Sequence, residues 1–112
     1  MRIVTVVETA EFERRANELM SDEERQEIFD FIARNPGAGV SIGSGVRKVR
    51  FARKGGGKSG GYRVVHFHGD EAMPIFLLTV FAKNDKSALT RSETDAIRKL
   101  GNLLSDTYGR PR

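Results

Sequence analysis

The stretch GVRKVRFARKGGGKSGGYRVVHFHG, residues 45–69, carries the strongest structural signals in this sequence. From Val46 onward the residue types alternate with a period of two, which is typical of a β-strand. Residues 54–61 then contain five glycines among eight positions, and residues 61–68 resume an extended, largely apolar pattern. Two such segments joined by a glycine-rich turn predict a β-hairpin, whose turn can bring backbone N–H groups close to an anion.

The hairpin is also the basic part of the chain. No acidic residue occurs from Pro36 to Gly69, whereas nine of the 15 acids lie between Glu8 and Asp30. This asymmetry predicts one surface that binds an anionic polymer such as a phosphate backbone. The alternative is that the acids and bases pair with each other in the fold. The cations of the stretch are Arg47, Lys48, Arg50, Arg53, Lys54, Lys58 and Arg63.

Several kinds of site are not expected. The sequence has no cysteine, which excludes disulfides, thiolate metal sites and a cysteine nucleophile. The turn contains GGGKS, but the full G-x-x-x-x-G-K-[ST] spacing is absent and no helical pattern follows, so a nucleotide P-loop is not predicted. Two histidines without a companion acid at ligand spacing do not predict zinc. We therefore expect neither a metal nor a cofactor.

The rest of the chain shows alternating strand and helix signals. Ser21 with Glu24, and Thr90 with Glu93, match the capping box that begins a helix. Apolar residues recur at helical spacing after Thr9 and after each box. The expected elements are a strand at 3–7, helices at about 9–20 and 21–34, a loop at 36–45, hairpin strands from 46 and at 61–68, an apolar central strand at 73–82, and a helix from about 90 to 108.

The resulting element order is β-α-α-β-β-β-α. It predicts an α+β fold with a small, largely antiparallel four-stranded sheet in a single domain, residues 1–112, of which 109–112 form a loose basic tail. The N-terminal apolar run of about five residues is too short for a signal peptide or a membrane span. We expect a cytoplasmic protein without a membrane partner.

The element order, the segment GVRKVRFARKGGGKSGGYRVV, and IFLLTVFAKNDKSALT followed by a last helix resemble the RelE/HigB-like toxins of bacterial type II toxin–antitoxin systems. The resemblance covers roughly residues 40–106. It implies a compact sheet with helices on one side and metal-independent cleavage of mRNA in the ribosomal A site. It also implies a cognate antitoxin, which we expect to be of the helix-turn-helix type. The toxin is then expected to bind operator DNA only as part of its complex with this antitoxin.

The resemblance assigns roles to several residues. Arg63 and Lys83 match family cations of the third and fourth strands, and Lys54 is a further catalytic candidate on the basic strand. Family members also carry a tyrosine near the C-terminus, but Tyr108 is not at an equivalent position, which leaves the proton-transfer step unassigned. The residues expected to contact RNA are Lys48, Arg50, Arg53, Lys58 and, by stacking on a base, Phe81.

Each of these residues also has an ordinary structural interpretation. Arg63 could pair with an acid such as Glu8 or Asp85, Lys83 could be a solvated strand end, and Phe81 could belong to the core. His66 and His68 share the face of Tyr62 and Val64, opposite Arg63, so without a bulge they cannot join Arg63 in one cleft. Strand alternation should place Lys48, Arg50, Ala52 and Lys54 on one face and Arg47, Val49, Phe51 and Arg53 on the other.

Two other functions fit the same sequence features. One is a toxin of the related ParE type that acts on DNA gyrase. The other is a basic module that binds RNA or the ribosome without cutting it. The unneutralised cations of the hairpin favour the nuclease over the gyrase-directed toxin.

Overall fold

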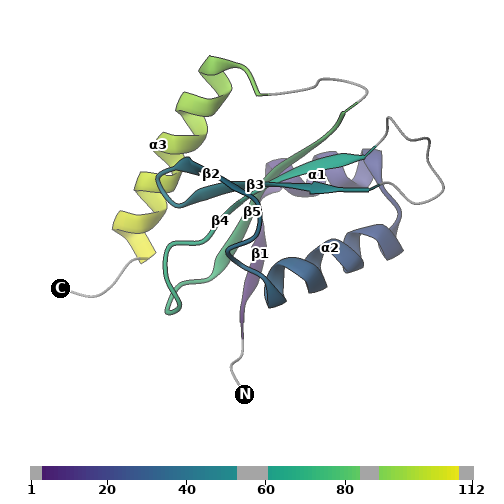
Figure 1. The fold of residues 1–112 in the computed structure, drawn as a ribbon, viewed down its shortest axis with the longest axis horizontal. Coiled ribbons are helices and arrows are strands. Elements are labelled where there is room, and N and C mark those ends of the chain that lie inside the picture. Colours follow the sequence, from purple (N-terminus) through teal and green to yellow (C-terminus); the bar gives the residue numbers. More distant parts are fainter. Residues whose placement is uncertain (1–3, 53–60, 84–88, 109–112) are drawn as a thin grey trace.

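The computed structural model describes residues 4–52, 61–83 and 89–108. The predicted basic tail at 109–112 and the beginning of the predicted first strand lie outside them. In chain order the elements are β1 (Val6–Glu8), α1 (Ala10–Leu19), α2 (Asp22–Arg34), β2 (Val40–Gly43), β3 (Val46–Phe51), β4 (Tyr62–Phe67), β5 (Ile75–Ala82) and α3 (Arg91–Tyr108) (Figure 1).

The sheet has five strands in the order β1-β5-β4-β3-β2, with β1 parallel to β5 and the other three pairings antiparallel. The predicted α+β class and largely antiparallel sheet are therefore confirmed, but the predicted number of four strands is wrong. The fifth strand is β2, which lies in the segment predicted to be a loop. Ser44 and Gly45 join β2 to β3 with φ values of 57° and 80°. Two positive φ values in a two-residue connection are typical of a type I′ hairpin turn.

The predicted helix starts are confirmed. Thr9 caps α1 by accepting a hydrogen bond from the N–H of Phe12, and its hydroxyl donates to the carbonyl oxygens of Leu77 and Leu78 at 3.0 Å. Both capping boxes form, at Ser21 with Glu24 and at Thr90 with Glu93. The cap of α1 therefore also fastens this helix to the central strand β5.

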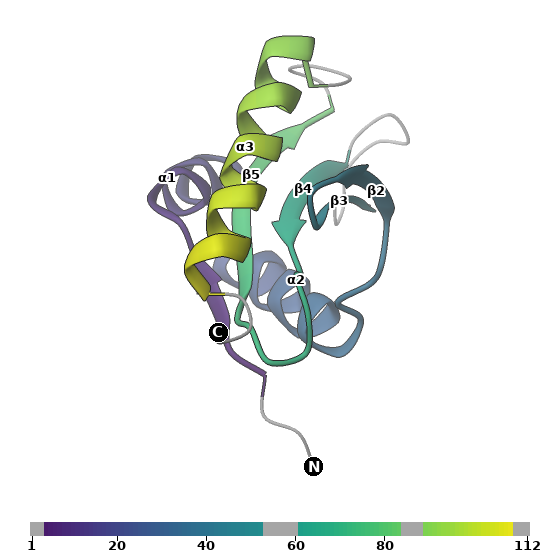
Figure 2. The same ribbon diagram turned by 90° about the vertical axis from the view of Figure 1, so that its left-hand side faces the viewer.

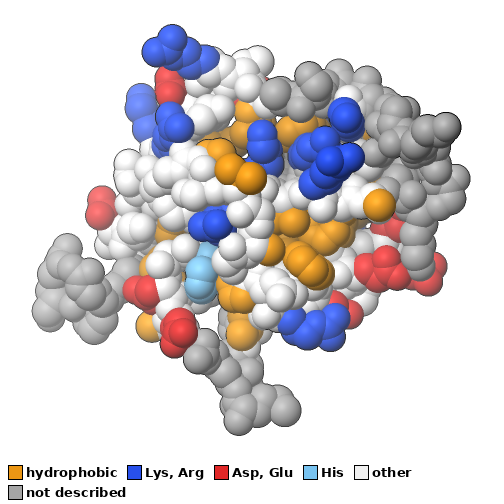
Figure 3. All heavy atoms as spheres, in the orientation of Figure 1, with side chains coloured by type: hydrophobic (Ala, Val, Ile, Leu, Met, Phe, Trp, Pro, Cys, Tyr) orange, Lys and Arg blue, Asp and Glu red, His pale blue; other side chains and the backbone are white. Residues whose placement is uncertain are grey.

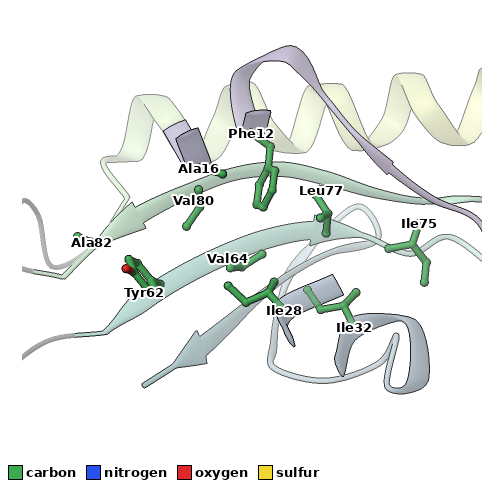
Figure 4. Close-up of a cluster of buried hydrophobic side chains, with 10 residues drawn as sticks. All are labelled: Phe12, Ala16, Ile28, Ile32, Tyr62, Val64, Ile75, Leu77, Val80 and Ala82. Carbon is green, nitrogen blue, oxygen red and sulfur yellow. The ribbon is translucent and has the colours of Figure 1, made fainter. Parts of the chain in front are cut away.

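One face of the sheet, here called the α1–α2 face, carries Tyr62 and Val64 of β4 (Figure 4). These side chains pack with Phe12 and Ala16 of α1 and with two isoleucines of α2. The helices contribute buried positions three or four residues apart, as an amphipathic helix does. Phe31 lies at helical spacing from the two isoleucines but is 38% exposed.

Tyr62 joins this core to the end of α1. Its hydroxyl donates to the carbonyl oxygen of Leu19 at 2.8 Å, while the whole residue is 1% exposed. We expect Tyr62→Phe to lower the free energy of unfolding by about 1 kcal/mol, because Leu19 loses its buried partner. Urea denaturation measures this change. Tyr108→Phe is the matched control, since Tyr108 is 50% exposed and its substitution should have no effect; an equal loss in both variants would contradict the prediction.

The opposite face, here called the α3 face, carries Val65 and Phe67 of β4, which pack against Ile97, Leu100 and Leu104 of α3. Figure 2 shows α3 running alongside β5. Helices therefore cover both faces of the sheet, whereas the resemblance had implied helices on one side. The predicted apolar stripe of α3 is only partly buried, because Leu103 is 59% exposed.

An irregularity in β5 decides which of its side chains face α3. Val65 pairs with Thr79 but His66 pairs with Leu77, so β5 has one extra residue at this point. Before it, Leu77 packs on the α1–α2 face; after it, Val80 packs there and Phe81 packs on the α3 face. A β-bulge of this kind reverses the alternation of a strand. As a result, the end of β5 presents Phe81 and Lys83 to the same face as Arg63.

In the described part of the chain, no helix combines the length and the hydrophobicity that a membrane span requires.

Candidate nucleic-acid interface

Cations from three adjacent strands meet on the α3 face. Arg50 of β3 pairs in register with Arg63 of β4, and Arg63 pairs with Phe81 of β5. Side chains directly opposite each other on neighbouring strands have Cβ atoms about 5 Å apart. Lys48 lies two residues before Arg50, and Lys83 lies two residues after Phe81, with its N–H donating to the carbonyl oxygen of Gly61. Lys48, Arg50, Arg63 and Lys83 together are called the cation row below.

The cation row has no charge partner among the described residues. None of its four side chains forms an ion pair or a side-chain hydrogen bond there, and Nη1 of Arg63 is buried without a hydrogen-bond partner. Glu8, one of the acids considered as a partner for Arg63, binds Arg25 instead, at 2.7 and 2.9 Å. A buried donor that lacks an acceptor costs about 1–3 kcal/mol. The row is therefore suited to bind an external anion.

The distribution of charge over the surface agrees with this interpretation. In Figure 3, Lys and Arg side chains gather over the strands, whereas most visible acidic side chains lie toward the margins, including a group at the end of α2 nearest α1. A surface with one sign of charge concentrated on it attracts an oppositely charged polymer. The segregation of charge seen in the sequence thus persists in the fold.

Arg47 does not belong to the cation row. It lies on the α1–α2 face of β3, where its Nε donates to the carbonyl oxygen of Ala38 at 3.1 Å and its Nη2 donates to that of Gly39 at 3.0 Å. These bonds hold the segment that leads into β2. One cation of the acid-free stretch is therefore structural.

Phe81 lies in the core. It is 3% exposed and packs in the cluster under α3, although it pairs with Arg63. A base could stack on this ring only after the neighbouring side chains had moved, so its position favours the core role over base stacking. Phe81 also lines a cavity of about 290 Å³ between α1, β5 and α3. That cavity is mainly apolar, and its charged lining consists of Glu11 paired with Arg15, and of Glu93, so it is not suited to phosphate.

The histidines lie away from the cation row. His66 is fully buried on the α1–α2 face, and its Nε2 is 2.8 Å from the carbonyl oxygen of Pro36. Because a carbonyl only accepts, Nε2 must carry the proton, and Nδ1 is then a buried acceptor without a partner. The extra residue of the bulge is in β5 and leaves β4 regular, so His66 and Arg63 remain on opposite faces.

Burial makes the stability of the fold depend on pH. Desolvation, with smaller contributions from His68 and Arg47, lowers the pKa of His66, so the unfolded chain binds a proton more readily than the folded one. The contribution of neutral His66 to the free energy of unfolding should be fully present above the pKa of an unfolded histidine, about 6.5. This contribution should be lost as the pH falls toward the lower pKa of the folded state. Urea denaturation between pH 8 and pH 5 measures this. His66→Gln keeps a donor for Pro36 but does not titrate; a pH dependence as steep as that of the wild type would contradict the prediction.

The remaining candidates are not part of the site geometry. Arg53, Lys54 and Lys58 lie outside the described residues. Tyr108 packs on Phe76 with ring centroids 5.3 Å apart, five residues along β5 from Phe81, or roughly 17 Å along the strand. Tyr108 is thus at the far end of the α3 face from Arg63. The described residues contain no group of three or more His, Cys, Asp or Glu placed to hold a metal ion.

Sequence reasoning missed one aromatic contact on the face of β3 opposite the cation row. Phe31 of α2 and Phe51 of β3 form an edge-to-face pair with centroids 5.4 Å apart. Phe31 lies at i+3 from Ile28 and i−1 from Ile32, so its helical position alone places it at the margin of the buried stripe. No signal in the sequence pairs it with a strand twenty residues away.

Comparison with protein families matches residues 2–109 to the family described as the RelE toxin of the RelE / RelB toxin–antitoxin system. The match spans both the basic hairpin strands and the helices on either face of the sheet. It implies a cognate antitoxin as a partner. From the fold, the cation row and this match, the chain belongs to the RelE toxin family and is the toxin of a toxin–antitoxin system.

Proposed function

We propose that this toxin is a metal-independent endoribonuclease that cleaves mRNA on the ribosome and thereby inhibits translation. The observation that carries the proposal is the cation row, whose four side chains have no acidic partner in the described residues and include the unpartnered Nη1 of Arg63. The family match supports a toxin, and the row supports an RNA phosphate as the group that it binds.

Cleavage without a metal can use the RNA itself as the nucleophile. The 2′-hydroxyl attacks the adjacent phosphorus while its proton passes to a base, and the bond to the 5′-oxygen breaks as that oxygen gains a proton. The products are a 2′,3′-cyclic phosphate and a 5′-hydroxyl. Atoms and electrons balance in this reaction without an oxidant, a metal or a cofactor.

Arg63 is assigned to the scissile phosphate. Its planar guanidinium remains charged and can hold two non-bridging oxygens at once. Negative charge grows on these oxygens as the fifth bond to phosphorus forms, so a fixed cation stabilises the transition state more than the substrate. Nη1 is buried without a hydrogen-bond partner among the described residues, so a phosphate would reach the guanidinium through its other N–H groups.

Lys83 is assigned to the leaving 5′-oxygen, where its ammonium group donates a hydrogen bond or a proton. Lys48 and Arg50 are assigned to flanking phosphates, together with Arg53 and Lys58 of the hairpin. Lys54 remains the third catalytic candidate. The logarithm of the RNA affinity should fall linearly with the logarithm of the salt concentration, and each phosphate contact should make this slope steeper.

The biological setting follows from the same proposal. The substrate is mRNA on translating ribosomes in the cytoplasm, and the antitoxin is a helix-turn-helix protein that carries the toxin to operator DNA. A small helix-turn-helix reading frame beside the toxin gene would support this partner. A neighbouring gene of another type would contradict the helix-turn-helix assignment.

The test is a cleavage reaction with the purified toxin, a defined mRNA and translating ribosomes, with a ribosome-free reaction alongside. We expect cuts that appear only with ribosomes and that leave 5′-hydroxyl ends, which polynucleotide kinase labels without prior dephosphorylation. Intact mRNA together with inhibition of gyrase supercoiling would replace the proposal by a ParE-like activity. Intact mRNA with tight RNA binding would replace it by a non-catalytic RNA-binding role.

A further inference from the structure

Phe31 and Phe51 form an exposed aromatic pair at the surface between α2 and β3. Their rings meet at 88° with centroids 5.4 Å apart. Phe31 is 38% exposed and Phe51 is half-buried, although both are large apolar side chains. Figure 3 shows hydrophobic side chains gathered next to the Lys and Arg side chains over the strands. Phe51 directly follows Arg50 in β3, so the pair lies one residue along the strand from the cation row.

The pair also lies at an open edge of the sheet. β2 pairs with β3 only at Val46, Arg47 and Lys48, so no described strand pairs with the outer side of Arg50 and Phe51. Successive residues of a strand point to opposite faces. Arg50 therefore projects toward Arg63, while the next residue, Phe51, projects toward Phe31. A cation and an aromatic ring lie on the two sides of the same edge, one residue apart.

We propose that Phe31 and Phe51 form a base-stacking platform for single-stranded RNA, next to the phosphates bound by Arg50 and Arg63. This inference rests on the proposed function, because the occupant is the RNA that the cation row is proposed to bind. An aromatic ring accepts any base, since every base presents a π-face. The platform thus adds affinity and positions the chain without selecting its sequence.

The two faces of β3 favour a base rather than a phosphate at this position. Arg50 attracts phosphates to the α3 face, whereas the other side of the edge presents the two apolar rings. A nucleotide that crosses the edge is therefore oriented, with its phosphate toward the cation row and its base toward the rings.

The first experiment measures binding without cleavage. The RNA is a single-stranded oligonucleotide with a 2′-O-methyl group at each position, so no 2′-hydroxyl can attack, and binding is followed by fluorescence anisotropy at several salt concentrations. We expect Phe31→Leu to weaken binding about tenfold, within the range for loss of one stacked base, with no change in salt dependence. Phe31→Tyr should bind as the wild type does. Leu103→Ala, at another exposed apolar residue on α3, should also have no effect.

A second variant reports on stacking directly. The chain contains no tryptophan, so Phe31→Trp introduces a single indole at the platform. Its emission should be quenched when the 2′-O-methyl RNA binds, and a Leu103→Trp variant should show no quenching. This measurement remains informative even if Phe31→Leu fails to fold.

Three results would overturn the platform. The first is that Phe31→Leu binds RNA as tightly as the wild type does. The second is that the emission of Phe31→Trp does not change when RNA binds. The third is that Phe31→Leu loses affinity only for the antitoxin, which would identify a protein interface. RNA binding by the wild type and quenching of Phe31→Trp, combined with a wild-type toxin that cuts no mRNA, would reject the nuclease function but retain the platform. Absence of RNA binding by the wild type, even at low salt, would reject both.

Discussion

Arg63→Ala is expected to lower the rate of ribosome-dependent mRNA cleavage about 100- to 1,000-fold, the range measured when one donor that stabilises transition-state charge is removed. The loss should appear in kcat, because the oxygens of the scissile phosphate carry more charge in the transition state than in the substrate. Arg63→Lys keeps the charge but not the planar fork, so it should recover only part of the rate. Single-turnover cleavage on translating ribosomes measures each rate.

Matched controls separate the site from net charge. Lys83→Ala should also reduce the rate strongly, because it removes the cation at the leaving oxygen. Arg34→Ala at the end of α2 and Lys99→Ala on α3 remove one exposed positive charge each, away from the cation row, and should cleave nearly as the wild type does. Equal cleavage and equal growth arrest by the wild type, Arg63→Ala and Lys83→Ala would eliminate the proposed catalytic assignments.

Gly101→Val is expected to cause the largest loss of stability. Gly101 is buried where α3 crosses the β2–β3 turn, and a Cβ atom there would overlap the carbonyl oxygen of Ser44 and lie 2.9 Å from Cγ2 of Val46. Because the backbone at Ser44 is held between two paired strands, it cannot yield as a flexible side chain can. We expect the free energy of unfolding to fall by about 2–3 kcal/mol, with a Tm lower by on the order of 10 °C.

The adjacent position supplies the control for Gly101. Asn102 is exposed on the same helix, and Asn102→Ala should leave stability unchanged or raise it slightly, since alanine has the higher helix propensity. Gly101→Ala also raises the helix propensity, but its Cβ atom would overlap the carbonyl oxygen of Ser44. We therefore still expect this variant to be less stable than the wild type. A Gly101→Ala variant as stable as the wild type would show that α3 does not depend on this close approach.

The candidate site was predicted from the sequence in part. Lys48, Arg50 and Arg63 were expected on the strands, and the structure places them on the α3 face; Lys83 was expected at the end of the last strand and directly follows β5. Whether they cleave RNA remains a prediction. The sequence did not indicate that Arg47 binds backbone carbonyls or that Phe31 is exposed against Phe51. These contacts join segments that are separate in the chain, and periodicity within one element carries no information about them.

The sequence by itself determined the helix starts, the two hairpin strands, the apolar central strand and the concentration of cations, because each depends on residues within one turn or one strand. Only the tertiary structure decided that β2 pairs as a fifth strand and that a bulge opposite β4 places Phe81 and Lys83 on the face of Arg63. Strand pairing and register are set by contacts between distant segments, and one extra residue in β5 changes the face of every side chain that follows it.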